Sequence, residues 1–490
     1  MEEDYIRLIF GLKMKQIRTE RNLSLFGLAK ATGLSKSYLN EIEKGKKYPK
    51  RDKIIALAEA LETSYDQLVS LKLDKNLAPI GEILQSRLLK EIPLELFGIR
   101  ESDLIDIIAE APVKVNAFIS TLIEISKHYN LSKESFYLAA LRSYQEANNN
   151  YFEEIEVAAE KFCKAYSIDQ NKKVSAQDLE EILIEEYGYT INNDELSQHE
   201  ELTNLRSVFI PNSKTLLISK QTDQSQRTFI YAKEIAYNFL NITDRLYTFS
   251  WIKFDTFDQV LNNFYASYFA GAMIIPRKIL VEELKAFFDK KQFDSEELRR
   301  IINRFTDSPE TFYQRLTNVL PKDFNLKNLF FLRFRHKPGR GFQMTKELHI
   351  TSSQEPHGNE NNLHYCRRWV AIKTLSEIPE TQSKHLIEAQ ISSYVDSNHQ
   401  YLVLSSATKD PIRGGFYRSI ALGILISNQA QNRISFLGDP GIPSKLVGVN
   451  CEKCAIADCQ ERAAAPTLLE REQRFAKTDQ VVLELMNKFK

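Results

Sequence analysis

The chain has 490 residues, of which 43% are hydrophobic and 27% are charged, and its formal net charge is zero. This composition excludes a disordered or fibrous protein, and the length exceeds what one hydrophobic core supports, so we expect two to four domains. No segment is apolar and long enough to span a membrane, and the acidic start MEEDYIRLIF is unlike a signal peptide. We therefore expect a cytoplasmic protein with no membrane partner.

Positive charge is concentrated near the amino terminus. Between Lys13 and Lys53 there are twelve lysines or arginines but only four acids, which is the pattern of a module that contacts phosphates. Apolar residues recur there in short bursts at helical spacing. Ser24 and Ser35 stand where helices begin, and Gly33 stands where one ends. The segment is therefore predicted to form brief helices joined by a tight turn, as in a helix-turn-helix.

The run LSLFGLAKATGLSKSYLNEIEKGKKYP resembles the Cro/repressor-type helix-turn-helix family, and the resemblance covers residues 8–70. It implies that double-stranded DNA is the partner and that residues 35–43 form the recognition helix. Many relatives have glutamine where Leu25 stands, so one polar contact is missing. The alternative is a basic, solvated helical bundle with no DNA partner. Carried over by position, the base-edge contacts are Lys36, Ser37, Asn40 and Glu41, and the phosphate contacts are Lys46, Lys47 and Arg51.

Residues 71–165 are acidic and apolar at helical period, and they carry no motif with chemistry. We interpret them as a helical connector, ending in one or two helices between residues 132 and 166. Cys163 is predicted to be an ordinary buried thiol on such a helix. Because short DNA half-sites generally require a two-fold protein, we expect a homodimer, with dimer formation among the roles of this connector.

Residues 166–330 contain two predicted strands in SVFIPNSKTLLISK, then the helical segments QRTFIYAKEIAYNFL and LNNFYASYFAGAMIIP. This order resembles the α+β domain of ImmA/IrrE-type metallopeptidases, whose first helix carries H-E-x-x-H. The matching positions here are Lys233, Glu234 and Tyr237, and the third metal ligand falls near Tyr265. Lysine and tyrosine are poor replacements for zinc-binding histidines. We therefore expect a peptidase fold without proteolytic activity; a metallopeptidase that acts on a partner regulator is the disfavoured alternative.

Residues 331–490 are predicted to be mixed α and β, with strands in NLFFLRFRHKP, QYLVLSSATKD and GGFYRSIALGILI. Cys451, Cys454 and Cys459 form C-x₂-C-x₄-C, and Cys366 precedes them in LHYCRRW. Four thiols satisfy the count for a metal centre, and the single C-x₂-C pair favours iron–sulfur over zinc. A mixed zinc site that uses the nearby His357 or His364 stays open, as do thiols without metal.

The helix-turn-helix, the altered peptidase segment, SPETFYQRLTNVLP…FFLRFR, CRRW and GVNCEKC…DCQERAAAP together resemble the short-chain fatty acid (propionate) transcriptional regulators. The resemblance implies a regulator that senses short-chain acyl-CoA. It also implies a [4Fe–4S] cluster on Cys366, Cys451, Cys454 and Cys459. A phage-type repressor or a toxin–antitoxin protein without effector would have no reason to carry this cysteine ending.

For the effector, phosphates call for arginine or lysine and an acyl tail calls for an apolar pocket, which makes Arg333, Tyr237 and Tyr265 the candidates. The predicted protein is thus multidomain. It has an all-α helix-turn-helix domain (1–70), a helical connector (71–165), an α+β ImmA/IrrE-like domain (166–330) and a mixed α/β sensor region (331–490).

Overall fold

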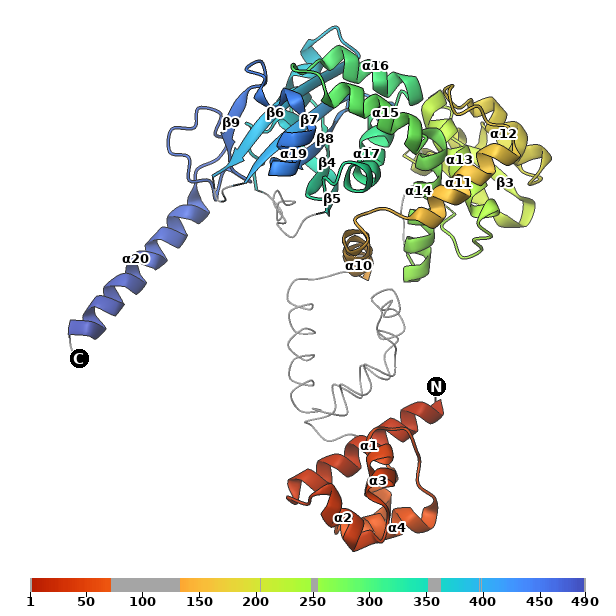
Figure 1. Cartoon of the computed structure of the whole chain (residues 1–490), viewed down its shortest axis with the longest axis vertical. Coiled ribbons are helices and arrows are strands. Elements are labelled where there is room, and N and C mark those ends of the chain that lie inside the picture. Colours follow the sequence, from red (N-terminus) through yellow and green to blue (C-terminus); the bar gives the residue numbers. More distant parts are fainter. Residues whose placement is uncertain are drawn as a thin grey trace. The chain divides into compact units, whose positions relative to one another are not determined.

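A computed structural model describes residues 2–71, 133–202, 204–247, 254–350, 363–395, 397 and 399–488. The chain divides into two compact units, Met1–Ala140 and Leu141–Lys490, and each is described by itself (Figure 1). Most of the expected helical connector, and His357, lie outside the described residues.

The first unit begins with five helices, which are α1 (Glu2–Glu20), α2 (Leu25–Thr32), α3 (Lys36–Glu43), α4 (Arg51–Ala60) and α5 (Tyr65–Val69). Local chemistry sets their bounds. The hydroxyl of Ser24 accepts a hydrogen bond from the Gly27 N–H and begins α2, and Ser35 does the same for α3 through the Tyr38 N–H. Gly33 ends α2 with a φ of 68°, in the left-handed region that glycine adopts without cost. The three capping residues predicted here from the sequence are confirmed.

The second unit contains a small three-stranded sheet and several helices that precede and follow it in the chain. The segment expected to hold one or two helices holds two, α10 (Lys133–Ala147), which spans the boundary between the two units, and α11 (Glu153–Ala165). They are followed by α12 (Ala176–Glu185), β1 (Thr190–Asn192), β2 (Ser207–Ile210), β3 (Thr215–Ile218), α13 (Gln224–Phe239) and α14 (Phe257–Ile274). The sheet order is β1-β3-β2, with β1 parallel and β2 antiparallel to β3. The predicted strand pair and both predicted helices are present, and α13 packs against α12 and α14.

A six-stranded sheet forms the rest of this unit, with the order β5-β4-β8-β7-β6-β9. Its strands are β4 (Leu329–His336), β5 (Phe342–Ile350), β6 (His385–Tyr394), β7 (Gln400–Lys409), β8 (Tyr417–Leu425) and β9 (Ser444–Val447). All neighbours are antiparallel except β6 and β9. The three strands predicted from the sequence are β4, β7 and β8.

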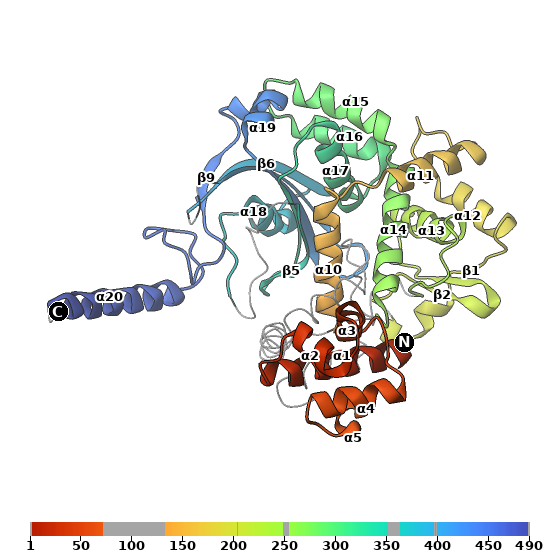
Figure 2. The ribbon, with the colours of Figure 1, turned by 60° about the horizontal axis from the view of Figure 1, so that its bottom comes forward.

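Helices cover both faces of this sheet (Figure 2). One face packs against α15 (Arg277–Phe288), α16 (Ser295–Phe305) and α17 (Pro309–Asp323). The other packs against α18 (Val370–Glu377). The first face belongs to a core that continues through α14 to α11, so the three-stranded sheet with its helices and the six-stranded sheet share one hydrophobic interior.

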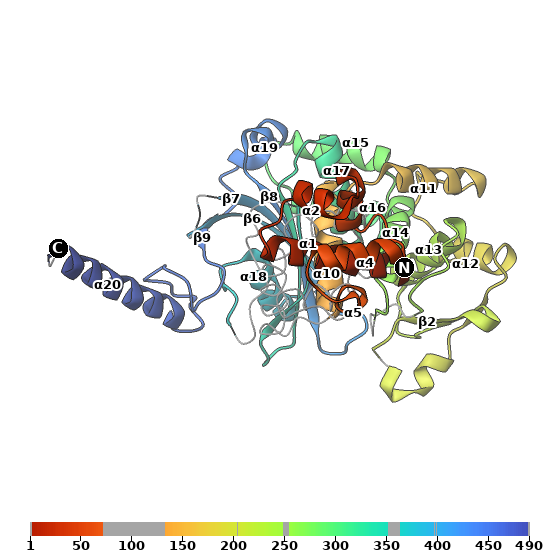
Figure 3. The same cartoon turned by 90° about the horizontal axis from the view of Figure 1, so that it is seen from below.

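The helix α20 (Thr467–Lys488) extends away from the sheet and buries none of its residues (Figure 3). None of the helices in the described ranges has the length and apolar character needed to cross a membrane. Cys163 lies on α11 with 2% of its surface exposed, and burial raises the pKa of its thiol, as expected for an ordinary buried cysteine.

Candidate functional site

Helix α3 has one buried and one exposed face. Leu39 and Ile42 are fully buried in the small core that α3 shares with α1, α2, α4 and α5. The opposite side of α3, the segment that follows it and the first residue of α4 carry the residues that the sequence assigned to DNA. The exposed ones are Lys36, Ser37, Asn40, Lys46, Lys47 and Arg51, and Glu41 is partly exposed. The structure therefore brings all seven predicted contacts to α3 and the segment that follows it, where they are open to a ligand.

Two of these residues form an ion pair in the absence of DNA. Lys47 Nζ lies 2.7 Å from a carboxylate oxygen of Glu41, and this contact raises the pKa of the lysine. The ring of Tyr38 lies under two cations, with Lys53 Nζ 4.4 Å and Lys47 Nζ 5.8 Å from its centroid. The sequence assigned Glu41 and Lys47 to separate tasks and did not single out Tyr38. The cation–π contacts of Lys47 and Lys53 with the Tyr38 ring became visible only in the fold.

The expected catalytic carboxylate of a metallopeptidase is neutralised here by an arginine. Arg245 donates to both oxygens of Glu234 at 2.6 Å, and the Tyr189 hydroxyl donates to the same carboxylate at 3.1 Å. Arg245 and Glu234 are each about 6% exposed. The guanidinium carbon lies 3.9 Å from the centroid of the Tyr237 ring, so cation and ring stack closely. Glu234 is held as one half of a buried ion pair, which is not the state of a general base.

The neighbouring helix contributes Asn263 to this site. Lys233 Nζ donates to Asn263 Oδ1 at 2.5 Å, and burial lowers the pKa of Lys233 to about 7. The Tyr237 hydroxyl lies 3.4 Å from the same oxygen. Tyr265, which the sequence placed at the third ligand position, instead pairs its hydroxyl with that of Tyr144 on α10 at 2.8 Å. Asn263 is thus the α14 residue that contacts Lys233 and Tyr237, because Tyr265 lies on a different face of the helix.

Three of the four expected metal-binding cysteines lie together. The segments around Tyr365 and Asn450 form an antiparallel bridge, with hydrogen bonds from the Cys366 N–H to the Val449 carbonyl (3.2 Å) and from the Cys451 N–H to the His364 carbonyl (2.9 Å). Cys366, Cys451 and Cys454 are each 6% exposed. Burial raises the pKa of the Cys366 thiol to about 11, and the nearby Cys454 and Cys451 add to the rise.

The fourth cysteine and the histidine alternative are arranged differently. Cys459 follows in a half-exposed turn. The His364 ring nitrogen Nδ1 lies 2.7 Å from Glu452 Oε1, so Glu452 orients this imidazole. Among the residues that the structure describes, no three of His, Cys, Asp or Glu stand at metal-ligand spacing.

Polar groups of the backbone and of two side chains lie close to the three buried thiols. The Ala463 N–H donates to Cys451 Sγ at 3.3 Å. A Cβ at Gly448 would lie 2.8 Å from Cys454 Sγ, so the chain needs glycine for the sulfur to sit there. Two buried donors close by, Arg367 Nη1 and Trp369 Nε1, make no hydrogen bond within the described part of the chain. Amide donors and a cation around sulfur stabilise the charge of metal-bound thiolates.

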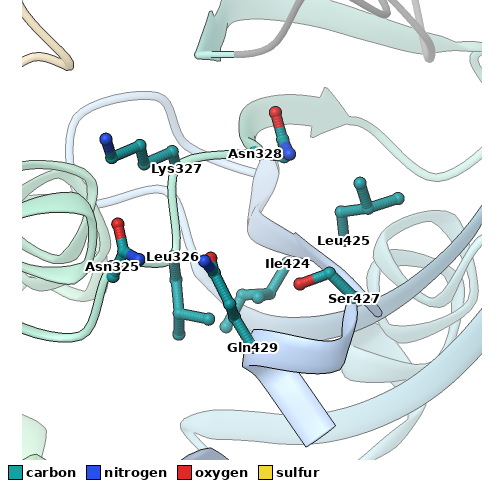
Figure 4. A pocket seen from close by; sticks show the side chains of 8 residues that line it. All are labelled: Asn325, Leu326, Lys327, Asn328, Ile424, Leu425, Ser427 and Gln429. Carbon is teal, nitrogen blue, oxygen red and sulfur yellow. The ribbon is translucent and has the colours of Figure 1, made fainter.

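Arg333, the remaining candidate for effector binding, lies on β4 and contacts α17. Its Nη1 donates to Glu310 Oε1 at 2.7 Å and its Nε donates to Thr345 Oγ1 at 2.8 Å. A separate pocket of about 210 Å³ opens at the start of β4 (Figure 4). It is lined by residues 325–328 and by Ile424, Leu425, Ser427 and Gln429. None of the predicted site residues lines this pocket.

Comparison with known proteins bears on the first unit. Residues 14–68 match the model of the helix-turn-helix family. This stretch contains α2, α3 and the turn at Gly33. Residues 14–68 therefore form a helix-turn-helix domain. No curated protein sequence matches the chain. Among solved structures, a Mycobacterium tuberculosis transcriptional regulator aligns with 18% identity and a TM-score of 0.47, over 66% of this chain and 92% of that one.

The helix-turn-helix domain also contains a buried ion pair that sequence reasoning missed. Arg18 of α1 donates to both carboxylate oxygens of Glu43 at 2.6 and 3.1 Å, and to the Leu23 carbonyl at 2.6 Å. Glu43 is 5% exposed. Its position in the recognition helix gave no signal of this role, because the partner lies in a helix that only the fold places beside it.

Proposed function

We propose that the protein is a sequence-specific, DNA-binding transcriptional regulator that acts as a homodimer. The observation that carries the proposal is α3 of the helix-turn-helix domain. Its apolar side is buried in the domain core, while Lys36, Ser37 and Asn40 are exposed on the other side and lysines flank it. A short amphipathic helix that presents donors of this kind has the form of an element that reads base edges in the major groove.

The test separates base recognition from phosphate contact. Lys36→Ala should cost about 1–3 kcal/mol against the preferred DNA sequence and relax sequence preference. Lys47→Ala should weaken binding to all sequences alike and reduce the slope of log affinity against log salt by about one. Binding is measured by fluorescence anisotropy over a salt series, after the preferred sequence has been selected from a random DNA pool. Equal effects of the two substitutions on sequence preference would contradict the assignment of α3.

We further propose that the second unit senses a small effector, of which short-chain acyl-CoA is our candidate, with Arg333, Tyr237 and Tyr265 as candidate contacts. The same unit is proposed to hold a [4Fe–4S] cluster on Cys366, Cys451, Cys454 and Cys459, with a zinc ion as the alternative. A bound cluster supplies redox sensitivity. The residues of the chain contribute the thiolates, the N–H donor to sulfur at Ala463 and the cation of Arg367.

Purification without oxygen tests this centre. The protein should be coloured, with broad visible absorption and close to four irons per chain, and Cys454→Ala should remove most of the iron. Cys163→Ala is the matched control, because this thiol is buried on α11 away from the other cysteines, and it should leave the iron content unchanged. A colourless protein with one zinc ion would establish the zinc alternative instead.

The metallopeptidase alternative is not supported by the geometry. The carboxylate that would act as base is bound by Arg245, and the first-helix ligand positions hold Lys233 and Tyr237. A casein-cleavage assay with added Zn²⁺ should give no activity above that of Glu234→Gln. Cleavage by the unmodified protein that is lost in this variant would restore the peptidase assignment.

A further inference from the structure

Cationic side chains gather on one face of the six-stranded sheet, at one end of three adjacent strands. Arg333 of β4 lies directly opposite Lys346 of β5, and Arg335 of β4 lies directly opposite Arg418 of β8. Directly opposite residues of antiparallel strands have neighbouring side chains, and like charges there destabilise the sheet. Two such pairs meet on β4, so this region is built against the electrostatic preference of a sheet.

One carboxylate, that of Glu310, interacts electrostatically with most of these cations. Glu310, in the first turn of α17, accepts from Arg333 at 2.7 Å and lies 3.9 Å from Arg418 Nη1. Arg333, Lys346, Arg206 and Arg418 together lower the pKa of Glu310 to about 2. Four cations thus act on one acid, which is ionised at neutral pH. Asp410 attracts Arg206 and Arg335 in addition, but the positive charge still exceeds the negative.

The cations are poorly hydrated but still reachable from solvent. The side chains of Arg333 and Arg418 are 25% and 11% exposed. Lys346 is more exposed, and it makes no hydrogen bond or ion pair with any residue in the described ranges. The charge of Lys346 also reaches Lys233 on α13 and contributes to the lowered pKa of that lysine.

A purely structural role does not account for this arrangement. One arginine paired with Glu310 is enough to anchor α17 to the sheet. Arg333 already forms that pair, with a hydrogen bond of 2.7 Å. The further cations add repulsion and desolvation, which a folded protein retains where a ligand compensates for them. A bound anion would compensate both effects.

We propose that the cluster formed by Arg206, Arg333, Lys346 and Arg418 around Glu310 binds the phosphate groups of a multiply charged small molecule. Arginine forks and a lysine ammonium are the groups that recognise phosphate oxygens, and several excess positive charges match a diphosphate better than a single carboxylate. Glu310 positions the guanidinium groups of Arg333 and Arg418 through its two oxygens. The regulatory meaning of this ligand rests on the proposed function, whereas its binding rests on the cluster alone.

Inorganic pyrophosphate is the first probe, with calorimetry on the full-length protein. The unmodified protein should bind pyrophosphate, and Lys346→Gln and Arg418→Gln should each weaken binding at least tenfold. Lys278→Gln is the matched control, because it removes an exposed lysine of the same unit that pairs with Glu160 on α11. It should leave affinity unchanged. Because Lys346 makes no hydrogen bond within the described residues, its variant should fold, and pyrophosphate should raise the melting temperature of the unmodified protein but not that of Lys346→Gln.

Two further ligands, ADP and citrate, distinguish the chemical class of the bound anion. Tighter binding of ADP than of pyrophosphate would support a nucleotide-borne diphosphate as the source, and equal binding would support a free one. Binding of citrate without pyrophosphate would overturn the phosphate assignment. Absence of pyrophosphate and ADP binding, or equal binding by Lys346→Gln, would overturn the site itself. None of these measurements involves DNA, so failure here is distinguishable from failure of the proposed regulator.

Discussion

Glu41 and Glu43 lie two residues apart on α3 and have different surroundings. Glu41 is partly exposed and pairs with Lys47 at the side proposed to meet DNA. Glu43 is buried and accepts two hydrogen bonds from Arg18 of α1. In a helix, residues two positions apart lie on different faces, so one acid is available for recognition and the other ties the recognition helix to its neighbour.

Removing Glu43 should therefore destabilise the helix-turn-helix domain. Glu43→Ala leaves the Arg18 guanidinium buried without its counter-charge, at a cost of about 3 kcal/mol. Glu62→Ala is the control, because the Arg21–Glu62 pair in the same domain is exposed and its loss should cost no more than about 1 kcal/mol. Amide hydrogen exchange in α1 and α3 of the full-length protein measures the loss of stability in both variants. Equal protection losses would show that the Arg18–Glu43 pair contributes no more than a surface pair.

At the scale of elements, α1 and α3 approach each other at a glycine. A Cβ at Gly11 would lie 2.2 Å from the Ile42 carbonyl oxygen and 3.0 Å from that of Glu43, and these backbone atoms cannot move independently of the helix. The helix that is proposed to enter the groove is thus seated directly on the backbone of α1. Any side chain at this position must push α3 outward.

Gly11→Ala should therefore weaken DNA binding through position alone. The displacement should cost about 2 kcal/mol of domain stability and lower DNA affinity at least tenfold, since the substituted residue is on α1 and not on α3. Gly27→Ala on α2 is the control, because its Cβ would meet side-chain atoms and no backbone, namely Ser24 Oγ at 3.3 Å and Leu23 Cδ2 at 3.5 Å. Fluorescence anisotropy with the selected DNA sequence compares the DNA affinities of Gly11→Ala and Gly27→Ala. Unchanged affinity in Gly11→Ala would mean that α3 tolerates a shift.

At the scale of the second unit, stability depends on keeping a partly buried imidazole neutral. Burial lowers the pKa of His385, at the start of β6, to about 4, and the charges of Arg299 and Arg418 contribute. The unfolded chain takes up this proton near the ordinary histidine pKa of about 6.5. Between these values the unfolded state binds more protons, so the free energy of unfolding falls as the pH decreases from about 6.5 towards 4.

Acidification from pH 7.5 to pH 5 should accordingly cost the second unit about 2 kcal/mol through His385. His385→Asn should reduce this pH dependence by that amount, whereas His199→Asn should not, because His199 is about half exposed. Urea titrations followed by tryptophan fluorescence at both pH values give the difference. The same dependence in His385→Asn as in the unmodified protein would contradict the role of this imidazole.

The sequence by itself determined the features that depend on neighbouring residues along the chain. The helix ends at Ser24, Gly33 and Ser35 follow from hydrogen bonds and φ angles that involve only the next few residues. The alternation in β4, β7 and β8, and the strand pair that contains β2 and β3, were likewise visible. The seven proposed DNA contacts came from a motif whose spacing is itself local, and the structure leaves all of them solvent-accessible.

The tertiary structure decided which distant residues meet. It placed Asn263, and not Tyr265, against Lys233, because the phase of α14 relative to α13 is set by packing. Only the bridge at Tyr365 and Asn450 brings Cys366 to the later cysteines.

Strand register is equally invisible in the sequence. Lys346 becomes the neighbour of Arg333, and Arg418 the neighbour of Arg335, through the pairing of β5, β4 and β8. This pairing depends on the whole hydrophobic face and not on these charges. Composition and local pattern thus determined the helix-turn-helix. Long-range packing determined which cysteines lie near one another and which cations form the cluster.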